Sequence, residues 1–279
     1  MTLTSEQLTA YREDGYLILR HLFSSDEISL LKQAAVADRQ LDQRSFGRAD
    51  GEGGTVRLSV WNQPGNGIYG MFSRNERLVN AAEDLLGGEV YHYHSKMILK
   101  DAKVGGAWTW HQDYGYWYHF GLLEPLLTSV TIAVDRATVE NGCLQVLKGS
   151  HKMGRVDHVL SGDQAGADME RVNEATKRFE LVHCEMEPGD AMFFDCNILH
   201  RSDQNTSDHS RWSLICCYNA ARNDPYKEGQ HASYSPLEKV GGNAIIHAGE
   251  AQGEQAEEMG WVSPAGDTTA EKLTAAAAK

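Results

Sequence analysis

Short segments rich in β-branched and aromatic residues, separated by turn-forming residues, occupy the chain between residues 90 and 220. Turn-forming pairs such as Gly105-Gly106 and Asn141-Gly142 lie between them. Short strands at irregular spacing favour two stacked antiparallel sheets, so the pattern predicts a mainly β, double-sheet jelly roll. The predicted strands are Val90–Leu99, Ser129–Val134, Cys143–Leu147, Phe179–Val182, Ala191–Phe194 and Trp212–Tyr218.

Helical signals come before this region. Residues 4–12 and the segment that begins at Ser24 each open with a hydroxyl residue followed three positions later by Gln or Glu, the spacing of a capping box. Residues 78–86 have a helical apolar pattern and end at two glycines. We therefore expect helices to flank the jelly roll on its N-terminal side. Residues 42–70 predict a loop with short extended pieces, and residues 152–178 predict a lid over a site or a disordered segment.

The chain has 279 residues and no convincing internal boundary, so we expect one domain. It would comprise a helical flank over about residues 1–89, a jelly-roll core over about 90–220 and a C-terminal extension over about 221–279. No apolar run approaches the ~20 residues that a membrane span needs. The N-terminus lacks the basic head and apolar run of a secretory signal. These features predict a cytoplasmic protein with no membrane partner.

The formal net charge of the chain is −13. Because a nucleic-acid-binding protein normally carries a basic surface that neutralises phosphates, nucleic acid is not an expected partner. The five cysteines include the adjacent pair Cys216 and Cys217 but no C-x-x-C spacing. This pattern argues against a disulfide framework or a structural zinc site and favours a reducing compartment.

The motif His111-Gln112-Asp113 follows the first predicted strand. Residues two apart on an extended strand point to the same face, so His111 and Asp113 are expected to present an imidazole nitrogen and a carboxylate oxygen to one point. His200, at the end of a later predicted strand, would complete a 2-His-1-carboxylate face. That ligand set holds non-haem Fe(II) and leaves coordination positions open for oxygen chemistry.

Two residues that follow His200 are candidates for binding a carboxylate. Ser202 lies two positions on, so its hydroxyl could face the same cavity. Arg211 opens the next apolar strand, and in an antiparallel pair its offset would bring it back beside His200. A fixed guanidinium, helped by the Ser202 hydroxyl, would bind a carboxylate as a bidentate fork.

These motifs resemble those of the phytanoyl-CoA dioxygenase family of Fe(II)/2-oxoglutarate-dependent oxygenases, over about residues 4–220. Within the family, the likeness is to bacterial small-molecule hydroxylases such as ectoine hydroxylase, in which a tryptophan stands six residues after the first histidine, as Trp117 does here. The resemblance is carried by His111-x-Asp113, His200, Ser202, Arg211, the segment Tyr11–Tyr16 and the signature-like segment Glu140–Lys152.

The resemblance implies a double-stranded β-helix, the cupin-like jelly roll, with the triad at its open end. It implies Fe(II) as the metal, 2-oxoglutarate as co-substrate and O2 as oxidant. The implied activity is hydroxylation of an unactivated C–H bond of a small metabolite, with release of succinate and CO2. Arg211 and Ser202 would hold the distal carboxylate of 2-oxoglutarate. Because Asp113 occupies the carboxylate position, no vacant site exists for chloride and a halogenase is disfavoured.

Six more residues are expected near the site. Strand alternation alone leaves Thr131 and Met97 equally able to face the core. His94 matches the position of a substrate-contacting residue in ectoine hydroxylase, although the residue type differs. His158 is assigned no role. The expected co-substrate contacts are Thr131, Met97 and Trp108, and the expected substrate contacts are His94, Tyr116 and Trp117.

The sequence leaves two alternatives open. The same oxygenase chemistry could end in desaturation, epoxidation or rearrangement, and no residue distinguishes these outcomes. A non-catalytic or zinc-bearing jelly-roll binding module would also use imidazole and carboxylate ligands, although it would not need the carboxylate clamp of Arg211 and Ser202. No residue pattern specifies the substrate or the oligomeric state.

Overall fold

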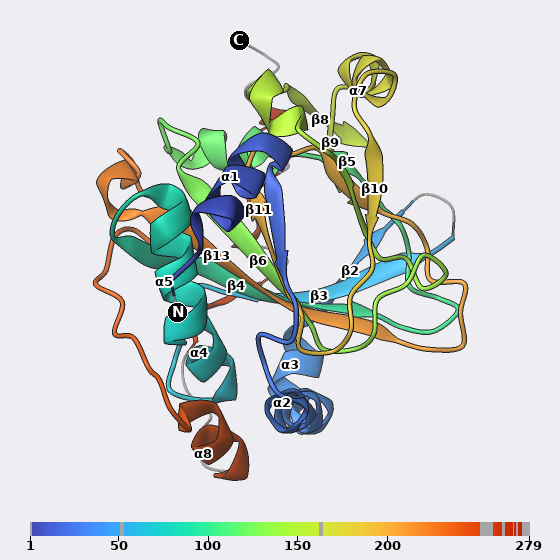
Figure 1. Cartoon of the computed structure of the whole chain (residues 1–279). Coiled ribbons are helices and arrows are strands. Elements are labelled where there is room, and N and C mark those ends of the chain that lie inside the picture. The colour runs from blue at the N-terminus through green and yellow to red at the C-terminus, as the bar shows by residue number, and fades with distance from the viewer. Residues whose placement is uncertain are drawn as a thin grey trace.

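Two antiparallel sheets face each other in this computed structural model, and helices cover the outer side of the larger sheet (Figure 1). Within the described residues, the larger sheet has eight strands in the order β1-β11-β6-β13-β4-β3-β14, with β2 paired to β3. The smaller sheet has four strands in the order β10-β7-β12-β5. The arrangement confirms the predicted double-stranded β-helix. The structure describes residues 2–50, 53–161, 164–251, 259–263, 266–269, 271 and 273–274.

The strands predicted between residues 90 and 220 are present, with small shifts at their ends. The larger sheet consists of β1 (Tyr16–Leu19), β2 (Phe46–Ala49), β3 (Thr55–Trp61), β4 (Val90–Lys100), β6 (Leu127–Ala133), β11 (Ala191–Asp195), β13 (Arg211–Ala220) and β14 (Trp261–Val262). The smaller sheet consists of β5 (Trp108–His111), β7 (Leu144–Leu147), β10 (Leu181–Cys184) and β12 (His200–Ser202). A separate hairpin consists of β8 (His158–Ser161) and β9 (Gln164–Ala167).

The expected helix caps form. The side chains of Thr4 and Ser24 each accept a hydrogen bond from the third residue of the helix that follows, and both capping boxes are complete. Gly87 ends α5 in the left-handed conformation that glycine adopts without strain. The helices are α1 (Ser5–Asp14), α2 (Ser25–Ala37), α3 (Arg39–Arg44), α4 (Ile68–Ser73), α5 (Glu76–Leu86), α6 (Asp113–Trp117), α7 (Met169–Thr176) and α8 (Ala244–Glu250), and the short 3₁₀ turns are η1 (Tyr118–Phe120), η2 (Ser150–Met153) and η3 (Ala221–Asn223).

Strand alternation divides the side chains of the larger sheet between two environments. Met97, Leu99 and Leu214 are buried in a core that also takes side chains from α2, α4 and α5. Lys96 and Ile98, the alternate residues of β4, line a cavity instead. Fully burying one Leu or Met contributes roughly 1.5–3 kcal/mol, so the helix-covered core stabilises the fold. The opposite face of the larger sheet, which is directed toward the cavity, can therefore carry polar residues.

Two expectations about the flanking regions need correction. Residues 42–70 are not mainly loop, because they contain the end of α3 and the sheet strands β2 and β3. Val56, Leu58 and Val60 of β3 alternate with Thr55, Arg57 and Ser59, so the strand pattern is present in the sequence even though most of β3 is buried. The expected core boundaries at residues 90 and 220 are also too narrow, since β1, β3 and β14 complete the larger sheet.

The segment 152–178 covers one end of the smaller sheet. Its described residues form the β8–β9 hairpin and α7, seen beside β10 and β5 in Figure 1. The side chain of Gln164 accepts a 2.9 Å hydrogen bond from the backbone N–H of Thr109 in β5. These contacts agree with a cover over the site rather than with a disordered segment.

All five cysteines are buried free thiols, in agreement with the sequence pattern, which argued against a disulfide framework. In the part of the chain that the structure describes, no helix is both long and apolar enough to cross a lipid bilayer.

Candidate metal centre and co-substrate cavity

His111, Asp113 and His200 converge on one point. Their nearest ligand atoms all lie within 4.8 Å of one another, and the three residues could hold a single metal ion. Asp113 Oδ1 lies 3.9 Å from His111 Nε2 and 4.0 Å from His200 Nε2. The two histidines are direct cross-strand partners on β5 and β12. Asp113 is not on the strand, because β5 ends at His111 and Asp113 begins α6; the extended residue between them still lets the two side chains converge.

Backbone carbonyls orient both imidazoles. The ring nitrogen Nδ1 lies 2.9 Å from the Thr109 oxygen in His111 and 3.0 Å from the Ile198 oxygen in His200. Each carbonyl requires a proton on Nδ1, which leaves the lone pair of Nε2 available to a metal ion. Burial lowers the pKa of both histidines, so both rings are neutral and able to bind a metal.

Two hydroxyl groups hold the Asp113 carboxylate. Ser129 donates to Oδ2 at 2.6 Å, and Tyr116 donates to Oδ1 at 2.5 Å. Burial alone would raise the pKa of Asp113, but the charge of Lys96 and the Ser129 hydrogen bond act in the opposite direction and the pKa is lowered. The ionised carboxylate and two neutral imidazoles form a donor set that suits a divalent first-row metal such as iron.

The cavity beside this triad, of about 80 Å³, lies between the two sheets. Arg211 is not brought there by pairing with the His200 strand, as the sequence predicted. Instead, β13 pairs with β4 and β6 while β12 pairs with β5 and β7, so the two strands belong to opposite sheets. Arg211 and His200 therefore line the cavity from different sides. Of the expected residues, the cavity brings together His111, His200, Ser202, Arg211, Thr131 and Trp108.

Arg211 is buried and only partly satisfied. Its Nη2 donates to the Gly142 carbonyl at 2.9 Å, and its Nε has no hydrogen-bond partner. Gly142 has φ +74°, and a side chain there would collide with the Asp203 carbonyl, so only glycine fits the turn that presents its oxygen to Arg211. Burial lowers the pKa of Arg211 to about 10, which leaves it charged. A buried cation with an unused donor fits a carboxylate ligand.

Lys100 is a second buried cationic group here, and sequence reasoning missed it. It lies directly opposite Arg211 on the neighbouring strand. Its Nζ donates to Ser202 Oγ at 2.9 Å and to the Asp203 carbonyl. Burial, followed by the charge of Arg211, lowers the pKa of Lys100 to about 6. A lysine at the end of a strand otherwise buried on both faces is the signal that could have identified it.

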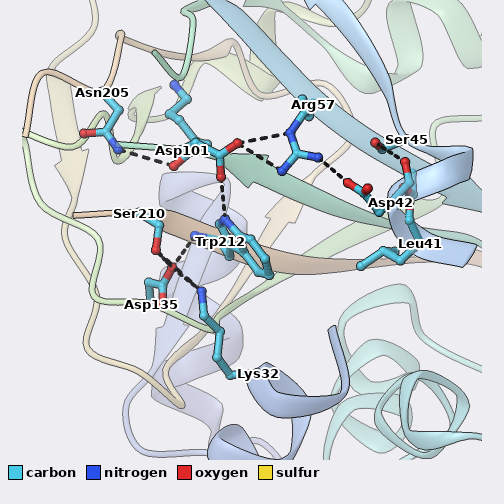
Figure 2. A network of polar contacts seen from close by, with 12 residues as sticks. Lys32, Leu41, Asp42, Ser45, Arg57, Asp101, Asp135, Asn205, Ser210 and Trp212 are labelled. Atoms are coloured by element: carbon cyan, nitrogen blue, oxygen red, sulfur yellow. Dashed lines mark hydrogen bonds and ion pairs between the residues drawn. The ribbon is translucent and has the colours of Figure 1, made fainter. Parts of the chain in front are cut away.

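A polar network holds Trp212, the neighbour of Arg211, from three sides (Figure 2). Its backbone N–H donates to Asp135 at 3.0 Å and its indole N–H donates to Asp101 at 3.1 Å. The Lys32 ammonium lies 3.7 Å above the ring and also pairs with Asp135. Arg57 in turn holds Asp101. The first residues of β13 are thus fixed where Arg211 enters the cavity.

A second cavity, of about 110 Å³, adjoins the first. Lys96 and Trp108 line both. His94, Tyr116 and Trp117, which were expected to contact the substrate, all line the second cavity.

Met97 does not lie beside the co-substrate. It is fully buried in the helix-covered core, because its neighbours Lys96 and Ile98 take the cavity face of β4. The expectation for Met97 is therefore wrong, and the reason is the phase of strand alternation.

His158 is closer to the centre than its sequence position indicates. Its Nε2 accepts a 2.9 Å hydrogen bond from the backbone N–H of Gln112, and its ring packs against Gly115 in α6. It therefore supports the turn between His111 and Asp113.

Comparison with known families gives the decisive match. The profile of the family described as phytanoyl-CoA dioxygenase (PhyH) matches residues 11–213, which include the whole triad and Arg211. The chain belongs to the phytanoyl-CoA dioxygenase family. It is a 2-oxoglutarate-dependent non-haem iron dioxygenase, with Fe(II) and 2-oxoglutarate as its cofactors.

Relatives within the phytanoyl-CoA dioxygenase family act on small molecules, as their names state. L-proline trans-4-hydroxylase of Streptomyces griseoviridis is 30% identical over 231 residues, covering 77% of this chain and 86% of that protein. Ectoine dioxygenase of Sphingopyxis alaskensis is 28% identical over 236 residues, covering 79% of this chain and 77% of that protein. Both matches extend over most of each chain.

A solved structure shares the fold. The crystal structure of EctD from S. alaskensis in its apo form has a TM-score of 0.72 and 24% sequence identity, and the match covers 86% of this chain and 88% of that one. The same protein has been solved with bound Fe and with 2-oxoglutarate and 5-hydroxyectoine.

Proposed function

We propose that this enzyme hydroxylates an unactivated C–H bond of a small metabolite and releases succinate and CO2. The observation that carries the proposal is a small cavity lined by His111, His200 and Arg211, which adjoins a second small cavity with an aromatic wall. The named activities of the relatives, on proline and on ectoine, support a substrate of that size. The enzyme would act as a single domain built around the larger and smaller sheets.

His111, Asp113 and His200 would bind Fe(II). When bound, the iron together with 2-oxoglutarate activates O2 for oxidation of a C–H bond. The protein's own part is to keep both imidazoles neutral and oriented and to hold the Asp113 carboxylate with Ser129 and Tyr116. A ligand set of three protein groups would leave further coordination positions of the metal open.

Arg211, Ser202 and Lys100 would bind the distal carboxylate of 2-oxoglutarate. Arg211 offers an unused Nε–H, and the Lys100 ammonium already meets the Ser202 hydroxyl. Thr131 and Trp108 line the same cavity and would enclose the co-substrate chain. The buried position of these groups makes their charge-assisted hydrogen bonds stronger than they would be in water.

The substrate would occupy the second cavity, against His94, Tyr116 and Trp117. Leu160 and Ala165 of the hairpin also line this cavity, so the segment 152–178 would exclude water from the reacting centre. Trp108 lies at the boundary of the two cavities and would separate the substrate from 2-oxoglutarate.

Succinate release from 2-oxoglutarate tests the proposal. The purified enzyme would be supplied with Fe(II), O2 and a panel of amino acids, betaine-like osmolytes, phosphonates and natural-product scaffolds. We expect compounds of one class to stimulate succinate release. Mass spectrometry should show that their product has gained one oxygen atom. His111→Ala should abolish the reaction, whereas His183→Ala, at an exposed position on β10, should retain it.

Two results would overturn the proposal. A product that has lost two hydrogen atoms and gained no oxygen would make the enzyme a desaturase. Absence of Fe(II)-dependent succinate release with every class would remove the assigned chemistry altogether.

A further inference from the structure

Lys96 lies where the two cavities meet and lines both of them. It stands on β4, with Val60 and Ile215 as its partners on the flanking strands. Within the described residues, its ammonium makes no hydrogen bond and no ion pair at contact distance. A partly buried ammonium that faces a cavity without a contact partner is available to a ligand.

The Asp113 carboxylate does not provide that partner. Both of its oxygens already accept a hydrogen bond, from Tyr116 and from Ser129. In the enzyme with iron, the same carboxylate would be a metal ligand. Lys96 affects the pKa of Asp113 through its field and not through a contact, so its ammonium is close to the metal centre but is not bound to it.

The other ionisable groups of the second cavity leave no net charge to balance Lys96. Arg48 and Asp267 pair with each other. His94 and His231 stack with their ring centroids 4.3 Å apart. Burial lowers the pKa of both histidines, to about 3 for His231, so the pair is neutral.

Charge balance around the iron gives the same result. The two positive charges of Fe(II) and the one of Arg211 equal the charges of Asp113 and of the 2-oxoglutarate dianion. Lys100, which has a pKa of about 6 in the unliganded protein, becomes charged when the co-substrate carboxylate binds beside it, so it adds positive charge and does not offset Lys96. Lys96 therefore remains as an uncompensated positive charge beside the reacting centre. A substrate with one negative charge would neutralise it, whereas a dianionic phosphate would introduce a second charge without a partner.

The walls of the second cavity suit the uncharged remainder of such a substrate. Trp117 is fully buried and its ring lies edge-on to His94 at 5.5 Å. His94 is 3% exposed, forms no hydrogen bond among the described residues, and its Nδ1 is buried without a partner. An aromatic surface with one unused polar group favours a compact, mostly apolar body with a single hydrogen-bonding group.

We propose that the substrate is a small monocarboxylic acid whose carboxylate pairs with Lys96 and whose body lies against Trp117 and the His94–His231 pair. The proposal rests on the proposed function, because it specifies the substrate class of that same site. Lys96 acts here as the specificity-determining residue, and it places the reacting C–H bond within a few bonds of the carboxylate.

Binding of matched acids and amides tests the proposal without turnover. Benzoate and cyclopentanecarboxylate, each beside its own carboxamide, would be titrated into the anaerobic Fe(II)–2-oxoglutarate complex. Calorimetry and the fluorescence of Trp108 and Trp117 would report binding. We expect at least one acid to bind about 10–100-fold more tightly than its amide, the range for a buried charge-assisted pair.

Variants at Lys96 assign that preference. Lys96→Met should reduce the difference between acid and amide to about twofold, and Lys96→Arg should keep most of it. Lys152→Met, at an exposed position in η2, is the matched control and should behave as the unaltered enzyme does. Thermal unfolding of each variant would establish that it is folded.

Two outcomes overturn the inference. Either no acid binds more tightly than its amide to the unaltered enzyme, or Lys96→Met weakens 2-oxoglutarate and leaves the acids unaffected, which would make Lys96 a co-substrate ligand. Tight acid binding without any succinate release would instead count against the proposed function alone. The two proposals can therefore fail separately.

Discussion

Lys100 and Arg211 lie directly opposite each other on neighbouring strands, so a buried amine stands next to the guanidinium that lines the co-substrate cavity. Lys100 forms its side-chain hydrogen bond with Ser202, the hydroxyl assigned to the same carboxylate. We expect Lys100→Met to raise the KM for 2-oxoglutarate about 10–100-fold, the effect of losing one charge-assisted hydrogen bond. The KM for the substrate should change little, because Lys100 does not line the second cavity.

Steady-state kinetics with varied 2-oxoglutarate would measure the effect of Lys100→Met. Lys103→Met is the matched control, because its ammonium is exposed and contacts the exposed Asp208 and the Thr206 carbonyl. An unchanged KM for 2-oxoglutarate in Lys100→Met would show that Lys100 is structural.

The affinity for 2-oxoglutarate should depend on pH through Lys100. Its pKa is about 6 in the unliganded protein, and a bound carboxylate would raise that pKa by favouring the ammonium. Binding should therefore take up a proton above pH about 6, and affinity should fall as the pH rises from about 6 to about 8. Calorimetry in buffers of different ionisation enthalpy would count the protons. Lys100→Met should flatten the profile, and an equal slope in both proteins would contradict the assignment.

The Tyr116 hydroxyl should strengthen metal binding. It donates at 2.5 Å to Oδ1 of Asp113, the oxygen that faces both histidines. Groups that orient a metal ligand in this way typically account for 10–100-fold in affinity, so Tyr116→Phe should weaken Fe(II) binding by about that factor. Competition with a chelator would measure the dissociation constant. Tyr118→Phe, at an exposed position, is the control. Unaltered metal affinity with impaired turnover would show that Tyr116 acts on the substrate and not on metal binding.

Asp135 should couple stability to co-substrate binding. One of its oxygens accepts from Lys32 at 3.0 Å, from Ser210 at 2.7 Å and from the backbone N–H of Trp212 at 3.0 Å (Figure 2). Asp135→Ala would leave these donors unsatisfied and should cost about 1–3 kcal/mol in the free energy of unfolding. It should also raise the KM for 2-oxoglutarate, because Trp212 directly follows Arg211 in β13 and a shift of Trp212 would move Arg211.

Urea unfolding and 2-oxoglutarate kinetics would be measured on the same Asp135→Ala preparation. Asp208→Ala removes a carboxylate that is 82% exposed and should alter neither quantity. A loss of stability with an unaltered KM would separate the Asp135 network from the position of Arg211.

The sequence predicted the elements that depend on neighbouring residues. Both capping boxes formed where Thr4 and Ser24 marked them, because a cap requires contacts over only a few positions. Convergence of His111 and Asp113 was likewise readable, since one extended residue separates them. Strand β3 carries the alternation that marks a strand, but it lies in a polar, glycine-rich stretch, so the sequence predicted only a short extended piece of a loop there.

The amino-acid sequence by itself determined the strands of the jelly roll, the metal-binding triad and, through the motifs around it, the family. Tertiary structure decided which face of β4 lines the cavity. Lys96 therefore lines it in place of Met97, the residue predicted to do so. It also decided that Arg211 comes from the sheet opposite His200, and that Lys100 stands beside it. The physical reason is that spacing along the chain specifies only relative positions within one element. Which side of an element is buried, and against what, depends on the packing of segments distant in sequence.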